Sequence, residues 1–393
     1  MMLPQSLNQV RKWNRQWIWT DVIGPMVAIR LALLLVGWLS QTILPNPNYP
    51  TQEAIARGWH FSQSRLLDMW ARWDAGWYLS IVQAGYFTNG DIQTTQSNIA
   101  FFPLYPYLIK LFVLLLPERL RTPERILIIA LVISNLLLIA ALILLHKLIA
   151  DFSERALAQR TILYLLLFPT GFILFCFYTE SAFLFLSVAA FYAASKKSWG
   201  LACLCGSLLS LTRPLGVLII IPLIWMYLES VEWKPLKIQK SVLWFLLIPL
   251  GLLFFLLYAH HLTGDYLAPI HAQKAWQKTF AMPWTTLFHS VGGDLQITHV
   301  EQILTILFIA LSILSLFKLP SMSYGIYSLL LILPPLTSGT LISTSRYYVV
   351  VFPAFILMAL LGRRAILDNL FKLVFFALQI LFVIAWARFY WVA

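Results

Sequence analysis

The chain has 393 residues and a formal net charge of +12; 60% of its residues are hydrophobic and only 11% are charged. Soluble domains carry roughly 25% charged residues, so this composition excludes a water-soluble globular protein. Apolar runs of about 20 residues, the length that spans a bilayer as a helix, recur along the chain. Their continuous rather than alternating pattern excludes a β-barrel. We therefore predict an all-α polytopic membrane protein with about ten or eleven transmembrane helices.

The basic residues gather beside the apolar runs rather than in a separate domain. This placement is typical of positive-inside anchoring and of contact with anionic headgroups, so membrane lipids are expected partners. It argues against nucleic acid as a partner. The flanking bases include Arg11, Lys12, Arg15, Arg119, Arg121, Arg125, Arg363 and Arg364.

In chain order, residues 1–21 form a short basic and aromatic lead, and the first span covers about residues 22–44. A polar stretch of about residues 45–100 follows, which we take as the first outer loop. Within it, residues 53–70 and 76–84 have helical, amphipathic spacing but too little apolar length to cross. We expect both to lie as helices on the membrane surface.

The remaining residues read as further spans and a second polar loop, at about residues 259–300, within a single domain of residues 1–393. Two apolar blocks, residues 160–195 and 200–228, are broken by prolines and fit either full short spans or re-entrant halves. The other expected spans cover about residues 101–117, 126–145, 242–258, 301–317, 322–342, 347–362 and 370–391.

The charge distribution also predicts sidedness. With a cytoplasmic N-terminus, residues 45–100 lie outside and residues 117–125 lie inside. The pair Arg363 and Arg364 then belongs inside. Residues 343–346 are therefore expected outside, on the same side as Asp74.

Asp74 lies in the sequence Arg72-Trp73-Asp74 just after an expected surface helix. As a general base it would accept a proton from an acceptor hydroxyl. Alternatively, Arg72 and Asp74 form an exposed ion pair beside a tryptophan anchor, which contributes little stability, and composition alone favours this second interpretation. Asp91, among small polar residues, is typical of a solvated turn.

Three ionisable residues interrupt apolar surroundings. Glu180 is a functional candidate because charge at membrane depth is costly, although a hydrogen-bonded structural glutamate fits equally well. Arg213 is the matching cation, for a carboxylate or a phosphate. Arg346 follows three hydroxyl residues and suits a lipid phosphate, or simply reaches a headgroup.

The aromatic residues Trp77, Tyr86 and Tyr105 would form a wall suited to sugar rings, or would simply mark the membrane interface. The second outer loop would form a polar lid over a sugar site. Its histidines match no metal-binding spacing, and the three cysteines give neither a disulfide framework nor a zinc motif. A divalent metal is therefore not indicated by any motif, and no cofactor is expected with certainty.

Taken together, these segments resemble the PIG-V-type mannosyltransferases, which add the second mannose in GPI-anchor synthesis, and their bacterial relatives. The resemblance is sharpest in Arg72-Trp73-Asp74-Ala75, in residues 81–86 and in Ala100-Phe101-Phe102-Pro103-Leu104-Tyr105-Pro106. Weaker similarities lie at residues 178–181, 212–216 and 345–347. The eukaryotic pattern has a histidine close to the position of Trp77, so the resemblance leaves the sugar and the acceptor open.

The resemblance implies a GT-C glycosyltransferase fold with juxtamembrane helices in the first outer loop. It also implies a polyprenyl-phosphate-linked sugar donor, a lipid or glycan acceptor, and inversion without a covalent intermediate. For a bacterial member, the site would face outward from the plasma membrane. Asp74 would be the catalytic base. We expect Arg346, Arg72 and Arg213 at the donor phosphate, and the substrate-binding residues Trp73, Trp77, Tyr86, Tyr105, Glu180 and Asp91.

A different class, a lipid or oligosaccharide flippase or transporter, would use Glu180 and Arg213 as gating charges within the membrane. It requires functional charges deep in several spans along a central path. The polar residues of this chain are instead concentrated in two outer loops, which favours a surface enzyme. A non-catalytic subunit of a membrane complex would tolerate the loss of Asp74.

Overall fold

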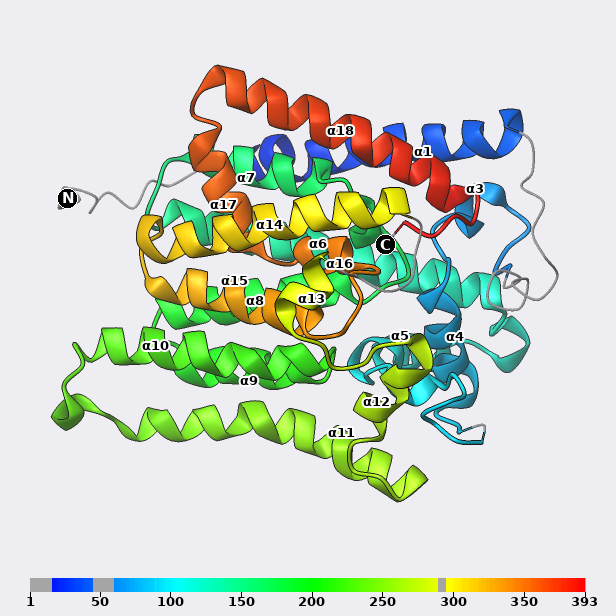
Figure 1. The fold of residues 1–393 in the computed structure, drawn as a ribbon, viewed down its shortest axis with the longest axis horizontal. Coiled ribbons are helices and arrows are strands. Elements are labelled where there is room, and N and C mark those ends of the chain that lie inside the picture. Colours follow the sequence, from blue (N-terminus) through cyan, green and yellow to red (C-terminus); the bar gives the residue numbers. More distant parts are fainter. Residues whose placement is uncertain (1–15, 45–59, 89, 289–294, 393) are drawn as a thin grey trace.

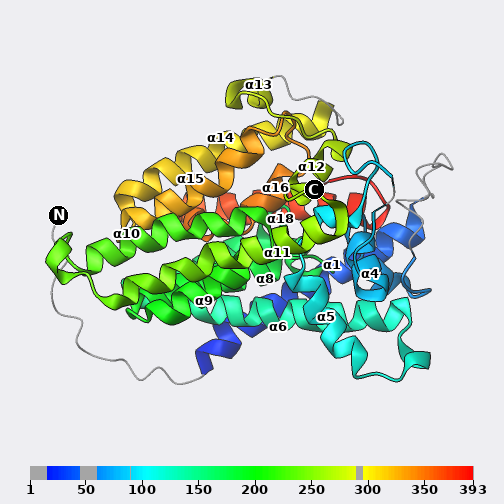
Figure 2. The same ribbon diagram turned by 90° about the horizontal axis from the view of Figure 1, so that it is seen from below.

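The computed structural model describes residues 16–44, 60–88, 90–288 and 295–392. Within these residues every regular element is a helix, which confirms the predicted all-α class. The longer helices run side by side along the long axis of one bundle, and short helices gather at one end of it (Figure 1). The same clustering appears in the view turned by 90° (Figure 2).

Five helices of the described chain are long and apolar enough to cross a membrane. They are α1 (Gly24–Ile43), which continues a π-helical turn at Ile18–Ile23, α6 (Pro123–Ala150), α11 (Leu247–Thr263), which continues a 3-10 segment at Lys240–Leu246, α14 (Leu295–Lys318) and α18 (Ala365–Ala387). Each of the five overlaps a span that the sequence predicts.

Shorter helices pack between and beside these five. They are α7 (Arg155–Leu167), α8 (Glu180–Ser195), α9 (Trp199–Ser210), α10 (Ile220–Ser230), α15 (Met322–Leu336) and α17 (Phe352–Leu361). Irregular backbone at membrane depth is tolerated where protein buries it, and every residue from 168 to 180 is buried. The expected number of ten or eleven spans is reached only if several of these shorter helices also cross the membrane.

The two ends of the bundle are defined by contacts between distant residues. At one end, Asp21 before α1 contacts His146 near the end of α6. At the other end, the Ser62 hydroxyl donates to Glu124 at the start of α6, with 2.7 Å between oxygens. We call these the Asp21 end and the Asp74 end.

One expected span does not cross. Helix α5 (Leu104–Leu114) has 11 residues and covers about 16 Å, roughly half of the hydrocarbon thickness. The loop after it returns to the Asp74 end, because Glu124 contacts Ser62 there. The expectations that residues 101–117 span the membrane and that residues 117–125 face the opposite side from residues 45–100 are therefore wrong. Arg121 instead donates to the carbonyl oxygens of Leu116 and Leu114 at the end of α5, at 3.0 and 3.2 Å.

The two proline-broken blocks are pairs of antiparallel helices rather than re-entrant halves. Helices α7 and α8 are joined by the buried loop at the Asp74 end, and Lys196 after α8 contacts Asp151 at the opposite end, at 2.7 Å. Trp199 at the start of α9 packs against Tyr227 near the end of α10, with ring centroids 5.0 Å apart.

The expected surface helices are only partly present. Residues 76–84 are helical but begin at Asp74, as α4 (Asp74–Ala84), and most of this helix is buried rather than at the surface. Of residues 60–70, only α3 (Arg65–Asp68) is helical, because the Asp68 side chain accepts a bond from the Phe61 N–H at 2.8 Å and holds the chain before it in a turn. Residues 53–59, Arg11, Lys12 and Arg15 lie outside the described residues.

Candidate active site

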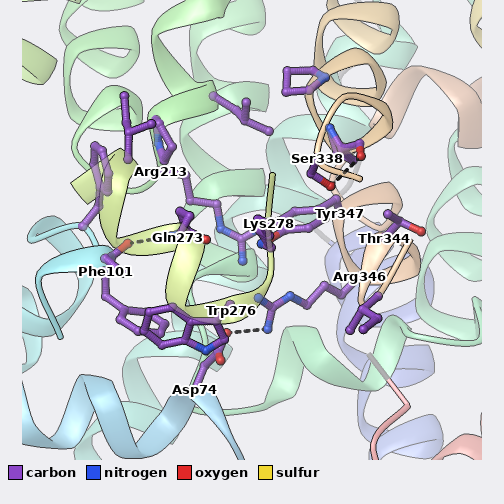
Figure 3. Close-up of a pocket in the computed structure, with 18 of the residues that line it drawn as sticks. Asp74, Phe101, Arg213, Gln273, Trp276, Lys278, Ser338, Thr344, Arg346 and Tyr347 are labelled. Carbon is purple, nitrogen blue, oxygen red and sulfur yellow. Dashed lines mark hydrogen bonds and ion pairs between the residues drawn. The ribbon is translucent and has the colours of Figure 1, made fainter. Parts of the chain in front are cut away.

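A cavity of about 390 Å³ opens at the Asp74 end, within the volume range of about 300–1,000 Å³ that is usual for small-molecule sites. It is lined by the start of α4, the chain before α5, the turn between α9 and α10, the second outer loop, and the segment after α15. Its charged or polar side chains include Asp74, Arg213, Gln273, Lys278, Arg346 and Tyr347 (Figure 3). Segments from most of the chain therefore meet at one cavity.

Asp74 is the first residue of α4, where a negative charge interacts favourably with the helix dipole. The residue before it, Trp73, has a φ of 50°, a strained value for a non-glycine residue. The Tyr178 hydroxyl bridges this turn, since it accepts from the Asp74 N–H at 3.2 Å and donates to the Arg72 carbonyl at 3.0 Å. The irregular turn thus aims the Asp74 side chain into the cavity.

Arg346 contacts the Asp74 carboxylate directly, with 2.6 Å between Nη1 and Oδ2. It lies in α16 (Thr344–Tyr348), a helix of five residues between α15 and α17. Its Nε is 3.8 Å from Glu180 Oε1. The prediction that Arg346 lies on the same side as Asp74 is confirmed by this contact.

Arg213 and Glu180 form a second ion pair behind the cavity wall. Pro214 disfavours helical backbone at the residue before it, so Arg213, three residues after the end of α9, adopts an extended conformation. The Arg213 guanidinium pairs with Glu180, the first residue of α8, and its Nε donates to Thr179 Oγ1 at 2.8 Å. The two charges that sequence reasoning singled out separately are therefore partners.

Tyr347 lies among three cations. The Arg213 and Arg346 guanidinium carbons are 5.1 and 5.3 Å from its ring centroid, and Lys278 Nζ is 3.5 Å from its hydroxyl. Burial raises the pKa of this phenol, but Lys278, Arg346 and Arg213 together outweigh burial and lower the pKa to about 7. This part of the cavity therefore favours an anion.

The second outer loop covers the cavity, as the idea of a polar lid requires. Its short elements are α12 (Ala268–His271), a 3-10 segment at Ala272–Trp276 and α13 (Pro283–Phe288). The backbone N–H groups of Thr279 and Ala281 donate to the carbonyls of Ser338 and Thr337, both at 3.1 Å. These bonds hold Lys278 over the cavity.

Aromatic rings form the rim beside Asp74. Trp276 and Phe101 line the cavity with ring centroids 5.8 Å apart. Trp77 stacks on Phe101 at 6.0 Å and lies 5.8 Å from Trp276, so it supports this rim from behind. Tyr78, one turn into α4, adds a further ring to the lining.

The other predicted site residues lie away from the cavity lining. Arg72 is buried and contacts Asp68 at 2.9 Å, and Trp73 packs edge-on against Trp391 at 4.7 Å. The Tyr86 hydroxyl donates to the Phe101 carbonyl at 2.7 Å, and the Tyr105 hydroxyl is 2.6 Å from Ser134 Oγ. Asp91 accepts from the Gln93 N–H at 2.9 Å in an exposed turn, as predicted. The structure thus brings together Asp74, Arg346, Arg213 and Glu180 but not these five.

Sequence reasoning assigned no individual role to Lys278, Trp276 or Tyr347. The first two were seen only as members of a polar loop, and Tyr347 only as part of a motif. A further buried carboxylate, Glu301 on α14, lies at the edge of an apolar run, where no sequence pattern distinguishes it from a residue at the end of a span. Among the described residues, no three His, Cys, Asp or Glu side chains lie close enough to hold a metal ion.

A family model described as mannosyltransferase (PIG-V) matches residues 39–260, which are 222 of the 393 residues. The chain belongs to this mannosyltransferase family. The resemblance found from the motifs is thus confirmed. The matched range contains Asp74, Glu180 and Arg213, whereas Lys278 and Arg346 lie beyond it.

A comparison of this family member with curated proteins finds no match. Among solved structures, it is similar to the oligosaccharyltransferase of Archaeoglobus fulgidus tethered with an acceptor peptide, at 11% identity and a TM-score of 0.48, over 94% of this chain and 55% of that chain. The oligosaccharyltransferase AglB from the same organism, in complex with an inhibitory peptide and a dolichol-phosphate, matches at 10% identity and a TM-score of 0.44, over 94% and 56%. The chain spans about half the length of these archaeal chains.

Proposed function

We propose that the protein transfers a sugar, mannose or another hexose, from a polyprenyl-phosphate-linked donor to a hydroxyl of a lipid or glycan acceptor. Asp74 is the general base, and the anomeric centre is inverted. For a bacterial member of the family, the reaction takes place at the outer face of the plasma membrane. Family membership supports the reaction class, and the charges around the cavity support the donor.

The observation that carries this proposal is the balance of charge at the cavity. Three cations surround the ring of Tyr347: Arg213, Lys278 and Arg346. Their ion-pair partners among the described residues are two carboxylates, Asp74 and Glu180. While the Tyr347 phenol is neutral, one positive charge remains, and it matches the single negative charge of a sugar–phosphate–lipid diester. A pyrophosphate-linked donor carries two.

The arrangement of residues suits an inverting transfer. In the view of Figure 3, Arg213 and Lys278 lie on the other side of Arg346 from Asp74. A donor phosphate held by these cations would present its sugar toward Asp74. For the sugar to fit between them, Arg346 turns from Asp74 to the phosphate, which its five N–H donors allow.

In the reaction, the acceptor oxygen attacks the anomeric carbon from the face opposite the phosphate. The new carbon–oxygen bond forms as the bond between the anomeric carbon and the phosphate oxygen breaks. Asp74 takes the proton of the acceptor hydroxyl, and polyprenyl phosphate leaves with the bonding electron pair. The three cations stabilise the negative charge that develops on the leaving phosphate.

The rim of Trp276 and Phe101 lies beside Asp74 and supports the position of the acceptor. Flat aromatic faces suit the apolar face of a sugar ring, and the rim is next to the base that the acceptor hydroxyl must reach. The flippase alternative relied on Glu180 and Arg213 as separate gating charges. Their direct ion pair at the cavity wall gives both residues a role in the enzyme site instead.

The test is a reconstituted transfer assay with purified full-length protein. We expect transfer from a hexose linked to a polyprenyl phosphate, none from a nucleotide sugar, and a product of inverted configuration by NMR. Transfer at the wild-type rate by Asp74→Asn, or a marked preference for a pyrophosphate-linked donor, would contradict the proposal.

A further inference from the structure

Glu301 is a buried carboxylate on α14, in a helix long and apolar enough to span the membrane, and only 2% of its surface is exposed. A carboxylate in such surroundings is costly unless hydrogen bonds compensate for lost solvation. Three donors meet it, all from α16: Thr344 Oγ1 at 2.6 Å, the Ser345 N–H at 2.7 Å and Ser345 Oγ at 2.8 Å. Glu301 thus binds the start of the short helix that carries Arg346.

Helix α16 needs such support. Five residues are far too few to form a stable helix without tertiary contacts. The residue before it, Ser343, has a φ of 65°, in the left-handed region. The Thr170 hydroxyl also donates to the Ser345 carbonyl at 2.9 Å.

The periodicity of α16 gives its two faces different partners. Ser345 and Tyr348, three residues apart, face α14, where they meet Glu301 and Thr305, four residues apart. Thr305 Oγ1 is 2.6 Å from the Tyr348 hydroxyl. The intervening residues of α16, Arg346 and Tyr347, line the cavity. The face fixed by Glu301 therefore sets the direction of the face that meets the substrate.

We propose that Glu301 is a positioning residue: by holding α16 against α14 it directs Arg346 and Tyr347 toward the donor phosphate, and so sets the affinity for the donor. This inference rests on the proposed function for the identity of the ligand. Glu301 itself does not line the cavity, and the described ion-pair partners of Arg346 are Asp74 and Glu180.

The sign of the effect separates positioning from simple electrostatics. If Glu301 acted only as a nearby negative charge, Glu301→Gln would strengthen the binding of a phosphate or leave it unchanged. If it positions α16, the same substitution weakens binding, because an amide cannot accept all three hydrogen bonds that the carboxylate accepts.

The first measurement is the dissociation constant for a polyprenyl phosphate without sugar, from the shift of the thermal unfolding midpoint of the full-length protein with ligand concentration. We expect Glu301→Gln to weaken binding about tenfold, as for the loss of a charge-assisted hydrogen bond. The KM for the donor should rise in parallel, and the KM for the acceptor should stay within about twofold. Ser312→Ala on the same helix is the matched control and should change neither constant, because the Ser312 hydroxyl donates to the Phe308 carbonyl of its own helix.

A second measurement does not depend on the donor. The ultraviolet absorbance of the Tyr347 phenolate, read as the difference between each protein and its Tyr347→Phe derivative, titrates near pH 7 while the cations surround the ring. We expect Glu301→Gln to move this titration to higher pH, because Arg346 moves away. The loss of a negative charge alone would move it to lower pH.

If Glu301→Gln does not fold, Ser345→Ala removes a hydroxyl donor to Glu301 at a residue outside the cavity lining while leaving α14 intact, and it should show the same two shifts more weakly. Unchanged or tighter phosphate binding together with an unchanged or lowered Tyr347 titration overturns the positioning role. Failure of wild-type protein to bind the polyprenyl phosphate contradicts the proposed function instead, and the Tyr347 titration still decides the role of Glu301.

Discussion

Two buried aspartates, at opposite ends of the bundle, show what distinguishes a structural carboxylate from a catalytic candidate. Asp21 accepts hydrogen bonds from Thr20, His146, Gln159 and both Nε and Nη2 of Arg155, at 2.6 to 3.1 Å. Trp17 stacks on the ring of His146 at 4.1 Å and covers this cluster. The acceptor capacity of the Asp21 carboxylate is thus filled by protein groups.

Asp74 is also buried, but its carboxylate makes far fewer contacts with protein groups. Its carboxylate has one ion-pair partner among the described residues, Arg346, and it borders a cavity large enough for a sugar. Acceptor capacity therefore remains for a substrate hydroxyl. Both aspartates are buried, so burial alone does not identify a catalytic carboxylate. Unused acceptor capacity that faces a cavity is what makes Asp74 a candidate.

The largest expected effect comes from the same substitution at both ends. Asp74→Asn should lower kcat by about 10²–10⁴-fold, the usual contribution of a general base, with an unfolding midpoint close to wild type. Asp21→Asn should leave the kcat of the folded protein unchanged but lower its stability by about 1–3 kcal/mol, because hydrogen bonds to a buried charge are lost. Transfer assays and thermal unfolding on both variants measure the two effects. A loss of kcat in Asp21→Asn, or of stability alone in Asp74→Asn, would contradict the assignment.

Arg346→Lys should show the next largest effect. Lysine keeps the charge but loses the planar fork of N–H donors that suits a phosphate. We expect kcat/KM for the donor to fall by about 10–100-fold, as for the loss of one charge-assisted hydrogen bond. Arg155→Lys, at the Asp21 end, is the control, and its donor kinetics should match those of wild type.

A smaller effect should appear in the dependence of donor binding on pH. Tyr347 is neutral below its pKa of about 7 and negative above it, so its phenolate neutralises the surplus charge of Lys278, Arg346 and Arg213 as pH rises. A phosphate diester keeps one negative charge across this range. Donor affinity should therefore fall above about pH 7, by at most tenfold per pH unit, and the slope should vanish in Tyr347→Phe. An identical pH profile in both proteins would exclude this competition.

The smallest effect concerns the turn before Asp74. The φ of 50° at Trp73 suits glycine better than any other residue, so Trp73→Gly should be more stable than Trp73→Ala by about 1 kcal/mol, although both lose the contact with Trp391. Ala75→Gly, inside α4, should instead lower the stability, because alanine favours a helix more than glycine does. Thermal unfolding of the three variants measures the difference, and alanine more stable than glycine at Trp73 would show that the turn is unstrained.

Most of the fold follows from local sequence. The apolar runs predicted nearly all of the long helices, because each must bury its backbone polar groups in its own hydrogen bonds within lipid. The exception is instructive: residues 101–117 are apolar enough to suggest a span, yet α5 is short and turns back where Arg121 bonds its last carbonyls. The hydrogen bond from Ser62 to Glu124 then holds the returning chain at the Asp74 end, and hydropathy does not contain that tertiary contact.

The sequence by itself determined the membrane class and the family, and it singled out Asp74 as a candidate, because composition and a contiguous motif are local properties. Only the tertiary structure decided which cations serve that carboxylate. It turned Arg72 toward Asp68 and out of the cavity lining, and it brought Arg346 from a segment 272 positions later to within 2.6 Å of Asp74. It also placed Glu301 beneath α16. Contacts between side chains so distant in sequence depend on how the helices pack, and no local pattern encodes that packing.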